Sequence, residues 1–284
     1  MDAAADYRER LEAWIAMHKV SLRDVAPTSI EIAGAMAGRG RDGWWVNQCV
    51  GLGIDRPVTG DDLQKLLQFY SEEPASPEIV VCDAAHESTA REVARVGLAV
   101  HSVEINMSAD LHADWPAVVS DVREVDLSDP DALDESITVM EQGFNSDDGH
   151  VVSDIEREEW RHARTRRGNQ VFAAYVDDEM AGIGCLLIPA QVPGKPWPAM
   201  LFGGGVRPGF RRRGLHRDLF LARLHAAKAA GCDFAVTEGD GDGPTVRNAR
   251  RLGMTHFCTN VHFKPPADDA TAGREAAATP ARDG

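Results

Sequence analysis

The segment from Leu201 to Gly231 constrains the fold of this chain more than any other stretch of its sequence. It opens with the apolar run LFGGGV, passes through the loop RPGFRRRG, and continues as LHRDLFLARLHAAKAAG. The apolar residues of this last part recur at helical spacing, namely Leu215, Leu219, Phe220, Leu224 and Ala227. The pattern predicts a strand, a loop and a helix in direct succession.

The loop brings positive charge to the start of the predicted helix. Arg211, Arg212 and Arg213 precede Gly214, whose missing side chain lets an anion approach the backbone. A helix N-terminus has unsatisfied N–H donors and the positive end of the helix dipole, so it suits a phosphate or pyrophosphate. We therefore expect an anion site at residues 211–216, with a solvated basic loop as the alternative.

Composition limits the partners of such a site. The formal net charge of −15 argues against nucleic acid, because phosphate-backbone binding needs a basic surface. The sequence shows neither a long apolar run nor a secretory leader, so we expect no membrane span and a cytoplasmic location. The five cysteines lack CxxC spacing and are expected to be reduced packing residues, with no metal site.

Two motifs resemble one known family. The spacing Val206-x-Pro208-x-x-Arg211-x-x-Gly214 resembles the acyl-CoA pyrophosphate loop of the GNAT superfamily of N-acetyltransferases. Further on, RNARRLGM at 247–254 resembles the next helix of that family, which ends in a glycine and a bulky apolar residue. Two positions depart from the family pattern. His216 stands where a small residue is usual, and Ala249 stands where many members have a tyrosine that protonates the leaving thiolate.

The resemblance implies an acyl-CoA co-substrate, acetyl-CoA or another short acyl-CoA, with its pyrophosphate on the loop. The residues expected to contact it are Gly205, Val206, Arg211, Arg212, Arg213, Gly214, Leu215, His216 and Asn248. The pantetheine would follow the strand ending at Val206, and the thioester would lie between that strand and the one ending at Glu238. An acceptor amine would attack the thioester directly, without a covalent enzyme intermediate.

This chemistry requires an oxyanion donor and a base. The glycine run 203–205 favours an irregular strand with a backbone N–H donor near Gly205 or Val206. Because the strand at 199–206 has no carboxylate, the candidate catalytic base is Glu238, for which a solvated strand-end glutamate is the alternative. The further candidates are Asp240, Asp242 and Glu159.

Residues 110–159 contain 16 acidic and two basic residues, and they form the two helices that rim the acceptor site in the family. This charge favours a cationic small-molecule amine as acceptor, with a solvated acidic face as the alternative. The function expected is N-acylation of that amine. The alternative, prompted by Ala249, is a non-catalytic acyl-CoA binding or sensing protein.

The element order recurs along the chain. An offset of 253 − 97 = 156 residues aligns Gly97 with Gly253, and it also aligns Val50 with Val206 and Arg91 with Arg247. Opposite Arg211 and Gly214, the first copy has Asp55 and Val58, which would repel the pyrophosphate and block its approach. The first copy is therefore expected to be degenerate.

The fold class expected is α/β, with two GNAT-like copies. Each would be a mixed, mostly antiparallel sheet flanked by helices, and the N-terminal copy would be truncated. The expected domains are a degenerate one at 1–117, a catalytic one at 118–266 and a disordered tail at 267–284. The sequence does not indicate an oligomeric state.

Local patterns predict the individual elements. Helices are expected at 4–20, 61–73, 88–96 and 129–143, the last with Asp129 as its N-terminal cap and Pro130 in its first turn. A hairpin is expected around the turn at 177–179. Single strands are expected at 29–37, 44–53, 79–82, 100–107 and 118–125.

Overall fold

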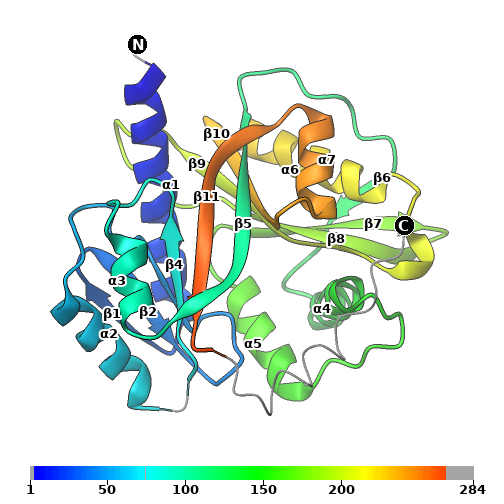
Figure 1. The fold of residues 1–284 in the computed structure, drawn as a ribbon. Coiled ribbons are helices and arrows are strands. Elements are labelled where there is room, and N and C mark those ends of the chain that lie inside the picture. Colours follow the sequence, from blue (N-terminus) through cyan, green and yellow to red (C-terminus); the bar gives the residue numbers. More distant parts are fainter. Residues whose placement is uncertain (1–2, 74, 267–284) are drawn as a thin grey trace. The chain divides into compact units, whose positions relative to one another are not determined.

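The computed structural model describes residues 3–73 and 75–266, which form a mixed α/β fold (Figure 1). The chain divides into two compact units. Unit 1 contains Met1–Val25 and Glu104–Asn260, and unit 2 contains Ala26–Val103 and Val261–Gly284. The division falls within two strands, β5 (Ala99–Asp110) and β11 (Thr255–Lys264), so each of them contributes to both units.

In unit 1 the strands follow the order β6-β7-β8-β9-β10-β5. The pair β9/β10 is parallel, and the pairs β6/β7, β7/β8, β8/β9 and β10/β5 are antiparallel. These strands are β6 (Asp121–Glu124), β7 (Asn169–Val176), β8 (Glu179–Leu187), β9 (Pro198–Val206) and β10 (Phe234–Asp240). The helices are α1 (Ala3–Val25), α4 (Pro130–Asn145), α5 (Asp154–Arg164), α6 (Leu215–Ala230), α7 (Pro244–Leu252) and the short 3₁₀ turn η1 (Pro208–Phe210).

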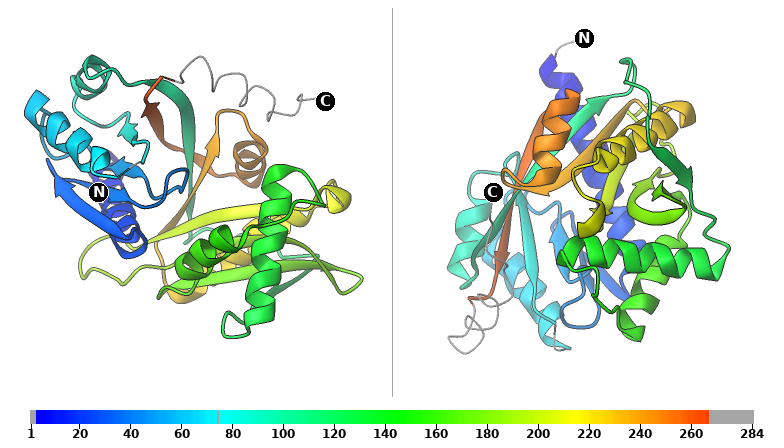
Figure 2. Two further views of the ribbon diagram at one scale, coloured as in Figure 1. Left: turned by 90° about the horizontal axis from the view of Figure 1, so that it is seen from below. Right: turned by 90° about the vertical axis from the view of Figure 1, so that its right-hand side faces the viewer.

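Helices cover both faces of the central strands of unit 1 (Figure 2). On one face, α6 packs its apolar stripe against the sheet, and the five predicted stripe residues are all buried. On the other face, α4 packs Val139 and Met140 against Ile183 and Cys185 of β8. Two-sided burial explains why β8 is apolar along almost its whole length.

Local signals explain where several of these elements begin or end, and the predicted cap of α4 is confirmed. The Asp129 side chain accepts from the Asp131 N–H at 3.0 Å, and Pro130 occupies the first turn of α4. Asp177 and Asp178 both have positive φ, at 52° and 61°, which is the geometry of a two-residue hairpin turn between β7 and β8. Gly231 and Gly253 end α6 and α7 in left-handed conformations.

Unit 2 contains the antiparallel pairs β1/β2 and β2/β3 and the parallel pair β3/β4. Its elements are β1 (Thr28–Ile32), β2 (Ala35–Arg39), β3 (Gln48–Val50), β4 (Glu78–Cys82), α2 (Gly60–Ser71) and α3 (Thr89–Arg95). Its core joins apolar residues of α2 and the strands, and Phe263 of β11 is buried in it. The last residues of β11 thus complete the core of unit 2.

The two copies share one order of elements, as the duplication predicts. β4 and β10 begin 234 − 78 = 156 residues apart, and β5 and β11 begin 255 − 99 = 156 residues apart. In both copies an antiparallel hairpin precedes a strand that pairs in parallel with the next one. The predicted α/β fold of two similar copies, the first of them shorter, is therefore confirmed.

Some local predictions were wrong. The strand expected at 29–37 is the hairpin β1/β2, because Ala33 and Gly34 adopt φ of 54° and 78° and reverse the chain. The strand expected at 44–53 is reduced to β3, since residues 44–47 form turns closed by backbone hydrogen bonds. The strand expected at 118–125 shortens to β6.

The compact units do not follow the sequence-based boundary at 117/118, because α1 and residues 104–110 of β5 belong to unit 1. The domain boundaries themselves stay a prediction. The tail expected to be disordered lies outside the described residues. No helix within 3–73 and 75–266 is long and apolar enough to cross a membrane.

We expect Phe263→Ala to destabilise unit 2 by about 3 kcal/mol, because it removes a buried aromatic side chain from the core. Hydrogen exchange measured by mass spectrometry should show faster exchange in peptides from residues 26–103. Val192→Ala, at a side chain that is 61% exposed, is the control. Equal loss of protection in residues 104–260 would contradict the assignment of Phe263 to unit 2.

Candidate functional site

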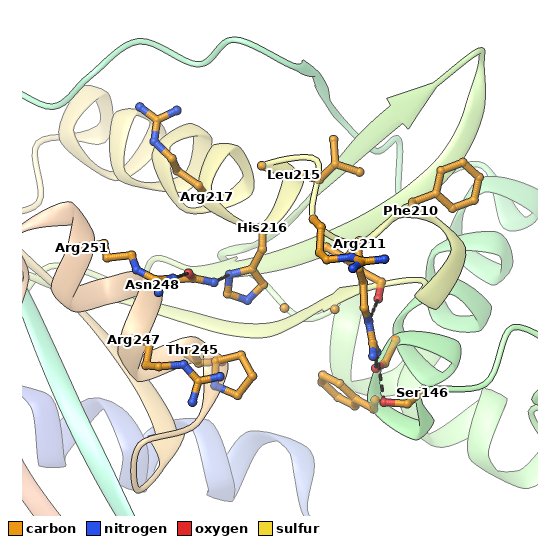
Figure 3. Close-up of a pocket in the computed structure, with 18 of the residues that line it drawn as sticks. Ser146, Phe210, Arg211, Leu215, His216, Arg217, Thr245, Arg247, Asn248 and Arg251 are labelled. Atoms are coloured by element: carbon orange, nitrogen blue, oxygen red, sulfur yellow. Dashed lines mark hydrogen bonds between the residues drawn. The ribbon is translucent and has the colours of Figure 1, made fainter. Parts of the chain in front are cut away.

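A cavity of about 680 Å³ opens in unit 1 beside the N-terminus of α6 (Figure 3). The end of α4, the end of β9, the loop before α6 and the helix α7 form its walls. Eight of the nine residues predicted to contact the cofactor line it: Gly205, Val206, Arg211, Arg212, Gly214, Leu215, His216 and Asn248. The ninth, Arg213, is not in the lining, and its guanidinium lies 5.6 Å from the centre of the Phe210 ring.

The N-terminus of α6 is open toward this cavity. Gly214 occupies the N-cap position with φ of 83°, and no side chain of the described chain caps the helix there. A Cβ added to Gly214 would meet no described atom within 4 Å. The first N–H groups of α6 therefore face space in which an anion could accept hydrogen bonds.

Arg211 connects the loop to α4. Its guanidinium donates to the carbonyl oxygens of Val206 and Gly143, at 3.1 and 2.8 Å, and to Ser146 Oγ at 3.1 Å. These hydrogen bonds hold the Arg211 side chain in the wall of the cavity. The other cationic residues of the lining are Arg212, Arg217, Arg247 and Arg251.

The strand β9 is irregular where it borders the cavity. Its register with β8 shifts between Ile183 and Cys185, and Gly203 has φ of 57°. The parallel pairing of β9 with β10 runs from Pro198↔Phe234 to Leu201↔Thr237. Beyond these pairs, the ends of β9 and β10 separate, which is the splayed geometry that the glycine run predicts.

Arg223 of α6 holds this irregular strand through hydrogen bonds to backbone carbonyl groups. Its Nη1 donates to the carbonyl oxygens of Cys185 and Phe202, at 3.1 and 3.2 Å, and its Nε donates to Leu219 O at 2.9 Å. Burial lowers the pKa of Arg223 to about 10, so it stays charged at neutral pH. Its N–H groups satisfy two carbonyl oxygens next to the register shift. The positive charge of the guanidinium is therefore fixed next to β9.

His216 is a half-buried, neutral imidazole in the wall of the cavity. Its Nδ1 lies 3.0 Å from the amide nitrogen Nδ2 of Asn248. The two side chains lie next to each other in Figure 3. Because that amide nitrogen can only donate, Nδ1 accepts and the ring proton is on Nε2. Burial, and secondarily the charge of Arg223, lowers the pKa of His216 to about 4, so it is unsuited to be a base at neutral pH.

The four carboxylates considered as bases lie in different surroundings. Glu238 does not line the cavity; its Oε1 lies 3.0 Å from His18 Nε2 of α1. Asp240 lines the cavity. Asp242 is exposed and pairs with Arg250 at 2.7 Å, and Glu159 is half-buried on α5.

The corresponding helix of unit 2 differs at its N-terminus. Thr59 caps α2, and the Asp62 carboxylate accepts from the Thr59 N–H at 3.0 Å. Arg56 donates to both oxygens of Asp62, at 2.8 and 2.9 Å, and this hydrogen bonding holds the pKa of Asp62 well below its usual range. Val58, which stands opposite Gly214, is buried in the core. The helix end is thus occupied by the chain's own carboxylate.

Sequence reasoning missed the contribution of α4, which supplies Gly143 and Phe144 to the cavity, and the role of Arg223. A signal for Arg223 was present, because a charged residue follows Leu219 by four positions on the apolar stripe of α6. No local pattern connects Gly143 to β9. Their contact depends on packing, since a Cβ on Gly143 would lie 3.0 Å from backbone atoms of Gly205 and Val206.

Comparisons with known proteins agree with this geometry. Residues 137–254 match the family described as Acetyltransferase (GNAT) family. Similar solved structures include a GCN5-related N-acetyltransferase from Kribbella flavida, with 14% identity and a TM-score of 0.63 over 93% of this chain and 97% of that one. No protein among those with curated functions matches the chain in sequence.

Two further solved structures are similar in fold. One is a tandem GNAT protein from the clavulanic acid biosynthesis pathway, with 15% identity and a TM-score of 0.61 over 94% of this chain and 97% of that one. The other is a GCN5-related N-acetyltransferase from Sphaerobacter thermophilus, with 16% identity and a TM-score of 0.54 over 78% of this chain and 73% of that one. Residues 137–254 therefore match a GNAT acetyltransferase domain, and the fold of the chain is similar to that of a tandem GNAT protein.

Proposed function

We propose that unit 1 is an acyl-CoA-dependent N-acyltransferase, which transfers an acetyl or other short acyl group to the amine of a small molecule. The observation that carries this proposal is the uncapped N-terminus of α6, which faces a cavity bordered by the separated ends of β9 and β10. The cytoplasmic location inferred from the sequence stays a prediction.

The cavity fits the diphosphate of CoA by charge and by donors. The first N–H groups of α6 and the guanidinium groups of Arg212 and Arg247 would hold the phosphates. The pantetheine would extend along β9 toward the register shift, with Asn248 beside its path. Acyl-CoA is a substrate here, and the chain supplies its binding and orientation.

Backbone geometry supports an oxyanion donor at Val206. The Arg207 N–H donates to Ala181 O of β8 at 3.0 Å. Because successive N–H groups of a strand point to opposite sides, the Val206 N–H points away from β8, toward the separated edge. Gly205, on the bulged part of β9, lets the chain approach α4 closely.

The proton transfers follow from the direct-attack route. The acceptor enters as an ammonium ion, loses a proton to a carboxylate, and its nitrogen then attacks the thioester carbon. The C–S bond breaks as the C–N bond forms, the nitrogen gives its second proton to water, and the thiolate takes a proton from water. Ala249 supplies no acid, and it is fully buried in the core of unit 1. Glu238 is the base that we propose, with Asp240 as the next candidate.

The acidic residues of α4 and α5 support a cationic acceptor, although Asp134 is already paired with Arg161 at 2.5 Å. Exposed carboxylates elsewhere on these helices would attract a cationic amine from solution. Two observations favour the alternative of a non-catalytic acyl-CoA binding or sensing protein: Ala249 at the position usual for the acid, and Glu238 outside the cavity lining. Measuring thiol release from acetyl-CoA with a panel of primary amines separates the two functions.

We expect Gly214→Val to weaken binding of CoA by more than about tenfold, because the side chain would fill the space in front of α6. Isothermal titration calorimetry of the folded variant measures this loss. Gly253→Val is a matched control, since Gly253 also has positive φ, at 94°, and open space around its Cβ, yet it does not line the cavity. Equal affinity in the Gly214 variant and the wild type would contradict the proposed pyrophosphate site.

We expect Glu238→Gln to reduce the turnover rate about 10²-fold at neutral pH, with little change in CoA affinity, because the amide keeps the size of the side chain and removes the base. The loss should shrink at higher pH as the free amine becomes available. Steady-state thiol release between pH 6 and 9 measures both effects. Glu158→Gln, on the exposed side of α5, is the control. Near-normal turnover across this range would exclude Glu238 and favour Asp240.

A further inference from the structure

Three side chains of the cavity wall form one series of hydrogen bonds. Arg251 Nη1 donates to Asn248 Oδ1 at 3.1 Å, and Asn248 Nδ2 lies 3.0 Å from His216 Nδ1. In Figure 3 the three side chains follow one another in a row from Arg251 to His216. All three residues line the cavity, so the series runs along its wall.

This series fixes the tautomer of His216. Because the Arg251 guanidinium can only donate, the Asn248 oxygen faces it and the amide N–H groups face the imidazole. Nδ1 of His216 therefore accepts, and the ring proton is on Nε2. Each donor is polarised by the one before it, beginning with the charge of Arg251. The Nε2–H is therefore a stronger donor than that of an isolated imidazole.

The Nε2–H of His216 has no hydrogen-bond partner among residues 3–73 and 75–266, in contrast to Nδ1. It faces Gly204 of β9, because a Cβ placed on this glycine would lie 3.7 Å from Nε2 and 3.6 Å from Arg223 Nη2. Gly204 lines the cavity and has no side chain, so a ligand atom can approach Nε2 there. A polarised N–H and the charge of Arg223 thus border the same part of β9.

Gly204 lies where the reacting end of the cofactor would lie. It falls between the pairs Gly205↔Ile183 and Phe202↔Cys185, inside the register shift of β9. With its diphosphate at the start of α6, an acyl-CoA would reach this part of β9 with the sulfur end of its pantetheine.

His216 stays neutral while it donates. Burial and the charge of Arg223 lower its pKa to about 4, so the ring takes up no proton at neutral pH. A neutral imidazole does not readily give up its N–H proton, and it acts by stabilising negative charge through a hydrogen bond. The group that such a donor favours most is an atom that gains negative charge during a reaction.

The proposed acyl transfer places negative charge on two atoms of the thioester. The Val206 N–H is the proposed donor to the carbonyl oxygen, whereas Ala249, buried in the core, offers the sulfur none. We propose that His216 donates its Nε2–H to the sulfur of CoA as the C–S bond breaks, and that Asn248 is the positioning residue that holds its tautomer. The thiolate still takes its proton from water, and His216 keeps its own. This inference rests on the proposed transferase function and adds a catalytic residue to it.

Turnover measurements separate this role from simple cofactor binding. We expect His216→Ala to lower kcat about tenfold at every pH between 6 and 9, with little change in KM for acetyl-CoA, because the donor acts only once charge develops on sulfur. His216→Gln, whose amide can accept from Asn248 and donate to sulfur, should keep most of the turnover. His225→Ala is the matched control, since His225 is also on α6 and does not line the cavity. A loss confined to KM, or a loss that follows the titration of an acid, would overturn the proposal.

The acidity of bound CoA tests the same contact without turnover. We expect the pKa of the CoA thiol to fall by about one pH unit or more on binding, and most of this fall to disappear in His216→Ala and to persist in His216→Gln. The ultraviolet absorbance of the thiolate measures the titration, with desulfo-CoA as the baseline. Equal thiol pKa values in the wild type and the alanine variant would overturn the proposal. A lowered thiol pKa without acyl transfer to any amine would support the donor and contradict only the transferase function.

The tautomer of His216 can be read in the wild-type protein, so this test needs no folded alanine variant. NMR of the imidazole nitrogens at neutral pH should show a proton on Nε2 and none on Nδ1, with the His216→Gln spectrum identifying the signals. In Asn248→Asp, whose carboxylate can only accept, a proton should move to Nδ1. A proton on Nδ1 in the wild type would overturn the donor role, and an unprotonated Nδ1 in the aspartate variant would overturn the positioning role of Asn248.

Discussion

The unsatisfied N–H groups at the start of α6 are the constraint around which unit 1 is organised. A helix end needs acceptors for its first N–H groups. In unit 2 the need is met internally, because Thr59 and Asp62 cap α2 and Arg56 neutralises the Asp62 carboxylate. In unit 1 the cap position is Gly214, and the helix end faces a cavity. One topology thus provides a closed helix end in one copy and an open one in the other.

The elements around α6 depend on this arrangement. Arg211 connects the loop to the end of α4, and Arg223 connects the middle of α6 to the irregular part of β9. The helix that would bind the phosphates therefore also holds the strand that would present an oxyanion donor. A buried guanidinium without a carboxylate partner is costly, and it is tolerated here because its hydrogen bonds go to backbone carbonyls. This coupling gives a physical reason why binding and catalytic orientation would depend on the same helix.

Local sequence patterns were sufficient for the parts of the site that lie close together in the chain. The loop at 211–216 and the apolar stripe of α6 are encoded by neighbouring residues, and both were predicted. The β1/β2 hairpin was missed because its turn places Ala33 in a left-handed conformation, which no turn signal at that residue indicates. The contact of His216 with Asn248 and that of His18 with Glu238 depend on how the helices of unit 1 pack, and a single sequence has no local signal for either.

The most direct test of the account is the number of CoA molecules that one chain binds. Titration calorimetry with desulfo-CoA, which cannot take part in acyl transfer, measures this number without turnover. The account predicts one molecule per chain, because α6 presents an open helix end and α2 is capped by its own carboxylate. A stoichiometry near two would show that the helix end of unit 2 also binds the ligand. Absence of binding would contradict the assignment of the cavity itself.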